Sequence, residues 1–218
     1  VISIKDNPEE NQLYTEDDPV TCGYPYGISK LQGERAALQL HDDHFSVIAL
    51  RQGTVCGWSP RMRFDLIVNT MVKSALTTGT ITVNNPSIWR PLLDIRDDVS
   101  AFIRAVQATL PLSGVFNVAS GNFTVGQVAD LVKEELERET HQRVRLDIKD
   151  VQDFRNYKVS CERAGVELGF QPQYSVKDMV AEVMEHRADY GDFERDAYYN
   201  IRMFKAMAAG RPQAAPVR

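Results

Sequence analysis

The sequence has little of what marks metal-binding, secreted or membrane-spanning proteins. Its three cysteines, Cys22, Cys56 and Cys161, form no CxxC pair and no metal-ligand pattern, which indicates reduced thiols in a cytoplasmic protein. The four histidines lie in polar stretches without metal-ligand spacing, so we expect no bound metal. No apolar run approaches the ~18 residues of a membrane-spanning helix, and the opening residues resemble neither a signal peptide nor a transit peptide.

Positive charge is also scarce. The 25 Lys and Arg residues face 30 Asp and Glu residues, which gives a formal net charge of −5. Non-specific binding of nucleic acid needs a basic surface, so we expect no nucleic-acid partner. With 43% hydrophobic and 25% charged residues, the composition is that of an ordinary globular protein. A chain of 218 residues is long enough to bury a full hydrophobic core.

A glycine-rich phosphate-binding turn is missing as well. Such a turn, of the type G-x-G-x-x-G, cradles a pyrophosphate at the start of a helix. The sequence begins with Val1 rather than Met and contains no such motif. We therefore expect a fragment or a trimmed chain.

The most informative residues present are 24–35, which read YPYGISKLQGER. Tyr26 and Lys30 are four apart in a predicted helix over residues 24–39, so they share one helix face. A free phenol titrates near pH ~10, and a neighbouring ammonium group lowers that value. Such a tyrosine can exchange a proton with a substrate hydroxyl or carbonyl while a hydride moves. The spacing alone also fits a solvated helix pair worth about 0.2–0.5 kcal/mol.

Helical and extended patterns alternate along the chain, which predicts an α/β architecture. Residues 45–50 (FSVIAL) form a short apolar run typical of a buried parallel strand. Residues 51–60 are predicted to form a loop after this strand, where open α/β sheets bind ligands. Residues 5–23 are predicted to form a long surface loop. Further helices are predicted near 64–77, 97–110, 124–139, 159–167 and 175–188, and further strands at 80–83, 114–119 and 143–148.

Several segments carry a family resemblance in the right order. The string P-Y-G-x-S-K-x-x-G-E at residues 25–34 resembles the active-site helix of extended short-chain dehydrogenases/reductases, the nucleotide-sugar epimerase/dehydratase family. Residues 50–57 resemble its L-R-x-x-N-V-x-G segment, with Thr54 in place of the commoner Asn. Residues 90–97 are similar to its R-P/D-x-[VI]-H-V-x-D segment, with Asp94 in place of His. The motifs y-N-v-g-s-G and D-x-R-x-Y-x-V-S…L-G-F are matched at 116–121 and 153–170.

The resemblance implies a Rossmann-like fold that lacks most of its N-terminal dinucleotide-binding half. Residues 1–57 would be a remnant of the NAD(P)-binding domain with the Tyr–Lys helix. Residues 58–210 would mainly bind the nucleotide sugar, with some returning Rossmann elements, and residues 211–218 would form a disordered tail. The family's catalytic Ser or Thr precedes its Tyr by about 25 residues, so it would fall at or before Val1, and Ser3 is a poor candidate.

The resemblance also assigns roles to individual residues. Tyr26 would be the catalytic acid/base, Lys30 would orient the cofactor ribose, and backbone near Gly53 would face the nicotinamide of NAD or NADP. The substrate, a nucleotide-diphosphate sugar, would be bound by the side chains of Thr54, Asn69, Arg90 and Arg155. The two arginines suit a diphosphate because a guanidinium group can bind phosphate oxygens with two parallel hydrogen bonds. The helix with Tyr26 would form a homodimer, and Asp97 is expected to be a helix-capping or structural acid.

Several alternatives stay open. The residues do not separate an epimerase from a dehydratase, a reductase or a decarboxylase, nor NAD from NADP. They do not identify the sugar or the nucleotide. A non-catalytic nucleotide-sugar-binding or assembly fragment, without cofactor binding, is the alternative from another class. A simple steroid- or alcohol-type reductase is disfavoured by the long segment after Gly57, which suits a bulky, charged substrate.

Overall fold

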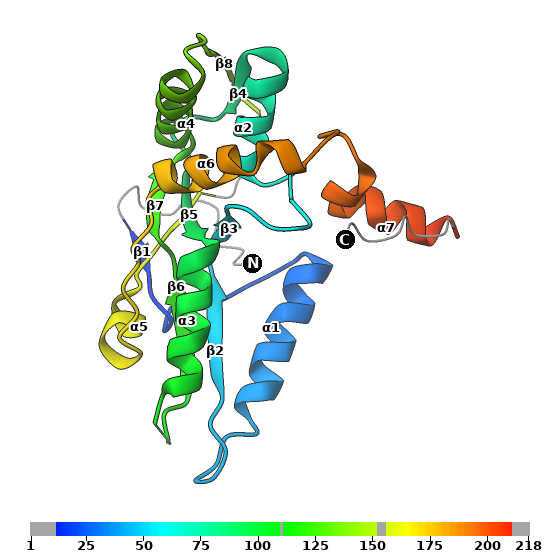
Figure 1. The fold of residues 1–218 in the computed structure, drawn as a ribbon. Coiled ribbons are helices and arrows are strands. Elements are labelled where there is room, and N and C mark those ends of the chain that lie inside the picture. Colours follow the sequence, from blue (N-terminus) through cyan, green and yellow to red (C-terminus); the bar gives the residue numbers. More distant parts are fainter. Residues whose placement is uncertain (1–11, 110, 152–155, 211–218) are drawn as a thin grey trace.

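The computed structural model describes residues 12–109, 111–151 and 156–210, in which helices and strands alternate (Figure 1). The helices are α1 (Pro25–Leu38), α2 (Ile67–Thr78), α3 (Ile95–Gln107), α4 (Val125–Thr140), α5 (Glu162–Glu167), α6 (Val176–Glu185) and α7 (Asn200–Ala208), with 3-10 turns η1 (Arg187–Asp189) and η2 (Asp196–Tyr198). The strands are β1 (Leu13–Tyr14), β2 (Ile48–Gln52), β3 (Thr54–Cys56), β4 (Thr80–Asn84), β5 (Trp89–Asp94), β6 (Gly114–Val118), β7 (Gly121–Thr124), β8 (Arg145–Lys149) and β9 (Lys158–Val159). No helix within these ranges is long and apolar enough to cross a membrane.

Most strand pairs are parallel, as the alternating pattern predicts. β2 pairs with β6, β3 with β5, β4 with β8 and β1 with β9 in parallel, and β7 joins β5 antiparallel. Helix α3 runs between β5 and β6, and α4 runs between β7 and β8. In Figure 1, α1 and α3 lie along β2, whereas α2, α4 and α6 gather with β4 and β8 at the opposite end. Helices and sheet strands thus form an α/β fold.

The larger hydrophobic cluster lies among α2, α4, α6 and β4. It includes Val72, Ile81, Val132 and Val180, none of which is exposed to solvent. Each fully buried aliphatic side chain of this kind contributes about 1.5–3 kcal/mol. A smaller cluster packs β6 against α3 and α5, around residues such as Phe116.

Helix α1 is held much more lightly than the other long helices. Gly27 is its only buried residue, and a helix of this length is marginal in water without tertiary contacts. Its main polar attachment is Glu34, whose two carboxylate oxygens accept hydrogen bonds of 2.7 and 2.8 Å from the guanidinium group of Arg51 on β2. Both side chains are mostly buried, so this pair is worth more than a surface ion pair.

A stripe of apolar side chains on α3 is also uncovered. Val99, Phe102, Ile103 and Val106 are each at least half exposed, whereas Ala101 on the opposite face is fully buried. Within the described ranges, β2 next to this helix pairs with β6 alone. The side of the fold formed by α1, β2 and α3 therefore exposes unusually much apolar surface for a parallel sheet, whose faces are normally covered.

Most predicted helices and strands are present, with corrections at short elements. Residues 51–60 do not form a loop throughout, because β2 continues to Gln52 and β3 follows Gly53. The expected surface loop 5–23 contains β1, and β5, β7, β9 and α7 had no predicted counterpart. These strands are short or contain Gly, Pro and Asn, which weakens their sequence signal. The tail 211–218 lies outside the described residues, and the division of the chain at residue 57 stays a prediction.

An aromatic cluster fixes the segment that leads to α7. The ring of Phe64 meets those of Tyr190, Phe193 and Tyr198 edge-on, at centroid distances of 5.2, 5.1 and 5.4 Å. The hydroxyl of Tyr198 donates a hydrogen bond of 3.0 Å to the Tyr190 carbonyl oxygen. This cluster connects the loop before α2 to residues 190–199.

We predict that Phe64→Ala lowers the free energy of unfolding by about 3–5 kcal/mol, because it removes a buried ring and leaves a cavity. Urea unfolding monitored by circular dichroism measures the change. Val166→Ala is the control, because Val166 is 79% exposed, and it should change stability by less than about 0.5 kcal/mol. A loss of similar size in the two variants would show that the cluster is unimportant.

Candidate functional site

Tyr26 and Lys30 lie together at the start of α1. The ammonium nitrogen of Lys30 is 5.9 Å from the centroid of the Tyr26 ring, and both side chains are exposed. Pro25 occupies the first turn of the helix, where its missing N–H costs no hydrogen bond. The hydroxyl of Ser29 donates a hydrogen bond of 2.8 Å to the Tyr26 carbonyl oxygen. The structure therefore places the phenol and the ammonium group side by side on one helix face, open to a ligand.

Gly53 and Thr54 lie where β2 passes into β3. The Gly53 N–H donates a 2.9 Å hydrogen bond to the Val118 carbonyl oxygen. A Cβ atom at Gly53 would lie 3.0 Å from the Pro91 carbonyl oxygen, so the close approach of β5 favours glycine here. Thr54 pairs with Leu92 on β5. Figure 1 shows the start of α1 at the same end of the fold as this junction, which is the carboxyl end of β2.

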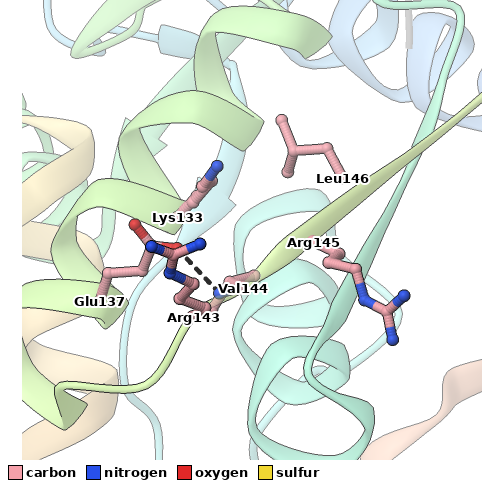
Figure 2. A pocket seen from close by; sticks show the side chains of 6 residues that line it. All are labelled: Lys133, Glu137, Arg143, Val144, Arg145 and Leu146. Atoms are coloured by element: carbon pink, nitrogen blue, oxygen red, sulfur yellow. Dashed lines mark hydrogen bonds between the residues drawn. The ribbon is translucent and has the colours of Figure 1, made fainter.

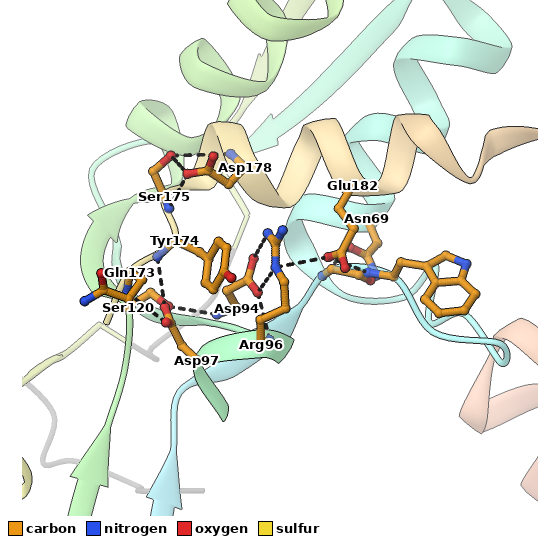
Figure 3. A network of polar contacts seen from close by, with 12 residues as sticks. Asn69, Asp94, Arg96, Asp97, Ser120, Gln173, Tyr174, Ser175, Asp178 and Glu182 are labelled. Carbon is orange, nitrogen blue, oxygen red and sulfur yellow. Dashed lines mark hydrogen bonds and ion pairs between the residues drawn. The ribbon is translucent and has the colours of Figure 1, made fainter. Parts of the chain in front are cut away.

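Asp94 is the centre of a polar network at the end of β5 (Figure 3). Its side chain is fully buried and accepts three hydrogen bonds from Arg96, from the backbone N–H at 2.8 Å and from the guanidinium group at 2.8 and 2.7 Å. These bonds hold the pKa of Arg96 above its ordinary value. The guanidinium carbon lies 3.7 Å from the centroid of the Tyr174 ring, and Nε lies 3.7 Å from the Glu182 carboxylate. Asp94 therefore ties β5 and α3 to α6.

Asp97 continues the network on α3. The Ser120 hydroxyl donates a 2.6 Å hydrogen bond to the Asp97 carboxylate and accepts one of 2.9 Å from the Asp94 N–H. The backbone N–H groups of Gln173 and Tyr174 also donate to this carboxylate, at 2.8 and 3.3 Å. Asp97 is thus a structural acid, as expected from the sequence, although the residue that caps α3 is Asp94.

A hollow of about 410 Å³ lies beside this network, at the carboxyl ends of β3 and β5. Its lining is mainly apolar and consists of Trp58, Ser59, Pro60, Ile95, Arg96, Val99 and Glu182. The indole of Trp58 stacks on His186 with centroids 4.2 Å apart, and its backbone N–H donates a 3.3 Å hydrogen bond to Glu182. Open α/β sheets bind ligands at this end, and apolar walls with few polar groups are typical of small-molecule sites. Sequence reasoning marked the loop that carries Trp58 but missed its partner on α6, 124 residues away.

The residues that the sequence predicts to bind the substrate have different surroundings in the structure. Asn69 is buried on α2, and its amide group bonds the backbone of the preceding loop. Its partners are the Gly57 N–H and carbonyl and the Arg63 carbonyl, at 3.2–3.4 Å. Arg90 lies on β5, two residues before the partner of Thr54, so Thr54 and Arg90 are on neighbouring strands. Arg155 lies outside the described residues. The structure therefore brings Thr54 near Arg90 and uses the Asn69 amide to shape the loop over residues 57–63.

Comparison with known protein families assigns the chain to one of them. A model of the NAD dependent epimerase/dehydratase family matches residues 4–119, which is more than half of the chain. The chain belongs to this family.

Many solved structures share the fold, and three of them illustrate it. MoeE5 in complex with UDP-glucuronic acid and NAD is 23% identical, with a TM-score of 0.67 over 81% of this chain and 59% of that chain. A dTDP-glucose 4,6-dehydratase from Bacillus anthracis in complex with NAD is 19% identical, with a TM-score of 0.69 over 84% of this chain and 59% of that chain. A UDP-glucose-4-epimerase from Stenotrophomonas maltophila with bound NAD and formylated UDP-arabinopyranose is 20% identical, with a TM-score of 0.68 over 80% of this chain and 58% of that chain. The chain thus spans about three fifths of the length of these relatives.

We predict that Asp94→Asn lowers the free energy of unfolding by about 1.5–3 kcal/mol, because Arg96 loses charged acceptors for its hydrogen bonds. The loss stays below that of a fully buried pair because the Arg96 side chain is 32% exposed. Urea unfolding measures it. Asp147→Asn breaks an exposed pair with Lys149 and should cost less than about 0.5 kcal/mol. Equal losses in the two variants would contradict a structural role for Asp94.

Proposed function

We propose that the protein provides the catalytic helix and the substrate side of an NAD(P)-dependent nucleotide-sugar epimerase, dehydratase or reductase. One observation carries this proposal: Tyr26 and Lys30 lie together on one face at the start of α1, at the end of the fold where β2 finishes. Family membership and relatives bound to NAD and UDP-sugars support it.

The proposed chemistry is proton transfer at a sugar hydroxyl. The Tyr26 oxygen would take the proton of the hydroxyl group on the carbon that is oxidised, and would return it when that carbonyl is reduced. The ammonium group of Lys30 would donate hydrogen bonds to ribose hydroxyls. The nicotinamide cofactor, when bound, supplies the hydride acceptor.

The described residues fit only part of such a cofactor. An exposed ammonium and an exposed phenol on one helix face suit a nicotinamide ribose. The pyrophosphate of a dinucleotide usually sits on a glycine-rich turn, and the sequence contains no such motif. Binding of the whole dinucleotide therefore requires groups beyond those of the described site.

The nucleotide sugar would lie along the junction of β3 and β5. Arg90 and Arg155 would hold the diphosphate, since guanidinium groups bind phosphate oxygens in a bidentate manner. Thr54, on the strand beside Arg90, would contact the sugar. Asn69 was predicted to contact the substrate directly. Because its amide group bonds the backbone of Gly57 and Arg63, we propose instead that Asn69 positions the loop over residues 57–63.

A nucleotide-sugar-binding fragment without catalysis is the second candidate. It is favoured by the light attachment of α1, on which Gly27 is the only buried residue, and by the missing glycine-rich turn. The homodimer through α1 and the cytoplasmic location stay predictions.

We predict that the chain binds UDP-glucose or dTDP-glucose in calorimetric titrations, and that Arg90→Gln weakens this binding about 10-fold or more, because a charged hydrogen-bond donor to phosphate is lost. Arg187→Gln, at an exposed arginine in η1, is the matched control and should leave the affinity unchanged.

A separate titration with NAD and NADP distinguishes the two candidates. Cofactor binding, together with a change in nicotinamide absorbance when the sugar nucleotide is added, supports the enzyme. In that case Tyr26→Phe should abolish the absorbance change but keep sugar-nucleotide binding. Sugar-nucleotide affinity without cofactor affinity supports the binding fragment. Failure to bind any sugar nucleotide would contradict both.

A further inference from the structure

A second hollow lies on α4 and β8, away from the residues of the site described above. It has a volume of about 540 Å³ and is formed by α4 and the segment that enters β8. Lys133 and Glu137 come from α4, and residues 143–146 complete the lining. In Figure 1, α4 and β8 lie at one end of the fold, whereas the stretch of β2 between α1 and α3 lies at the other. The hollow shares no lining residue with the site described above.

The lining of this hollow carries excess positive charge. Lys133, Arg143 and Arg145 contribute three cations against the single carboxylate of Glu137. One oxygen of that carboxylate accepts a 2.8 Å hydrogen bond from the Val144 N–H, so Glu137 also fixes the loop (Figure 2). The whole protein has a net charge of −5, so this excess of positive charge is a property of the hollow and not of the protein as a whole.

Neighbouring cations on the same elements are neutralised. Arg138, next to Glu137 on α4, forms ion pairs with Glu135 and Glu139, and Lys149 on β8 pairs with Asp147. Within the described parts of the chain, Lys133, Arg143 and Arg145 form no ion pair closer than 4.0 Å. On α4, on β8 and in the segment between them, the cations without an ion pair are therefore those that line the hollow.

The backbone around the hollow is well anchored. Val144 is buried beneath it, and the Arg145 N–H donates a 2.9 Å hydrogen bond to the Gly79 carbonyl oxygen as β8 pairs with β4. Figure 2 shows Lys133, Glu137 and Arg143 gathered on one side of the strand and Arg145 extending from the other. An anion would therefore meet cations whose backbone positions are already fixed, which reduces the ordering cost of binding.

We propose that this hollow binds a phosphate group, either free or as the phosphomonoester of a small molecule. A guanidinium group offers paired N–H donors to phosphate oxygens, and an ammonium group adds a point charge. Arg143 and Lys133 form the main contacts, and Arg145 attracts the anion from the edge of the hollow. Because α4 and β8 carry none of the residues proposed for the hydride chemistry, phosphate binding here is independent of that chemistry.

Calorimetric titration with inorganic phosphate and with glycerol phosphate tests this proposal, with glycerol as the uncharged probe. Binding of both phosphates indicates that the group itself is recognised, and binding of glycerol phosphate alone identifies a phosphomonoester. The double variant Lys133→Gln/Arg143→Gln should weaken binding about 10-fold or more. Arg138→Gln and Lys149→Gln are matched controls and should keep the affinity within about twofold.

Arg143 is exposed, and Lys133 is half-buried without an ion pair to lose, so the double variant should remain folded. Circular dichroism checks this directly. Addition of sodium chloride should weaken phosphate binding, because the contacts are electrostatic. The proposal is overturned if neither phosphate binds at about 10 mM, or if the hollow variant and the controls lose affinity equally.

Discussion

The arrangement of the site depends on one interaction, the hydrogen-bonded ion pair between the buried carboxylate of Asp94 and Arg96. A charge without solvent contact is costly unless it is fully hydrogen-bonded, and Arg96 supplies the matching donors. Because Arg96 also stacks on Tyr174 and approaches Glu182, the end of β5, the start of α3 and α6 are fixed together. These elements line the hollow beside Trp58, so the Asp94–Arg96 pair contributes to its shape.

The Tyr26 side of the site is built differently. Helix α1 relies on the pair of Glu34 with Arg51 and on few apolar contacts, and the apolar stripe of α3 beside it is uncovered. The relatives of known structure are longer, since this chain spans about three fifths of them. The proposed site thus combines a well-anchored hollow at the end of β5 with the Tyr26–Lys30 pair on a lightly held helix.

The sequence predicted the α/β fold and the pairing of Tyr26 with Lys30, because both depend on short-range periodicity. It did not predict the Asp94–Arg96 bond, since residues two apart do not normally face each other in a helix. Here Asp94 has an extended backbone as the N-cap, and its carboxylate can reach Arg96. The contact of Trp58 with Glu182 joins residues 124 positions apart, for which a single sequence offers no signal. Arg143 and Arg145 were read only as part of an alternating strand, and their missing ion pairs became visible only in the structure.

Hydrogen–deuterium exchange with and without UDP-glucose tests the central claim most directly, because it maps where the ligand binds. Our account predicts slower exchange at the junction of β2 and β3, in the loop over residues 57–63 and along β5 when the sugar nucleotide is added. Exchange in α4 and β8 should stay unchanged. Slower exchange confined to α4 and β8, with none at the carboxyl end of β2, would contradict it.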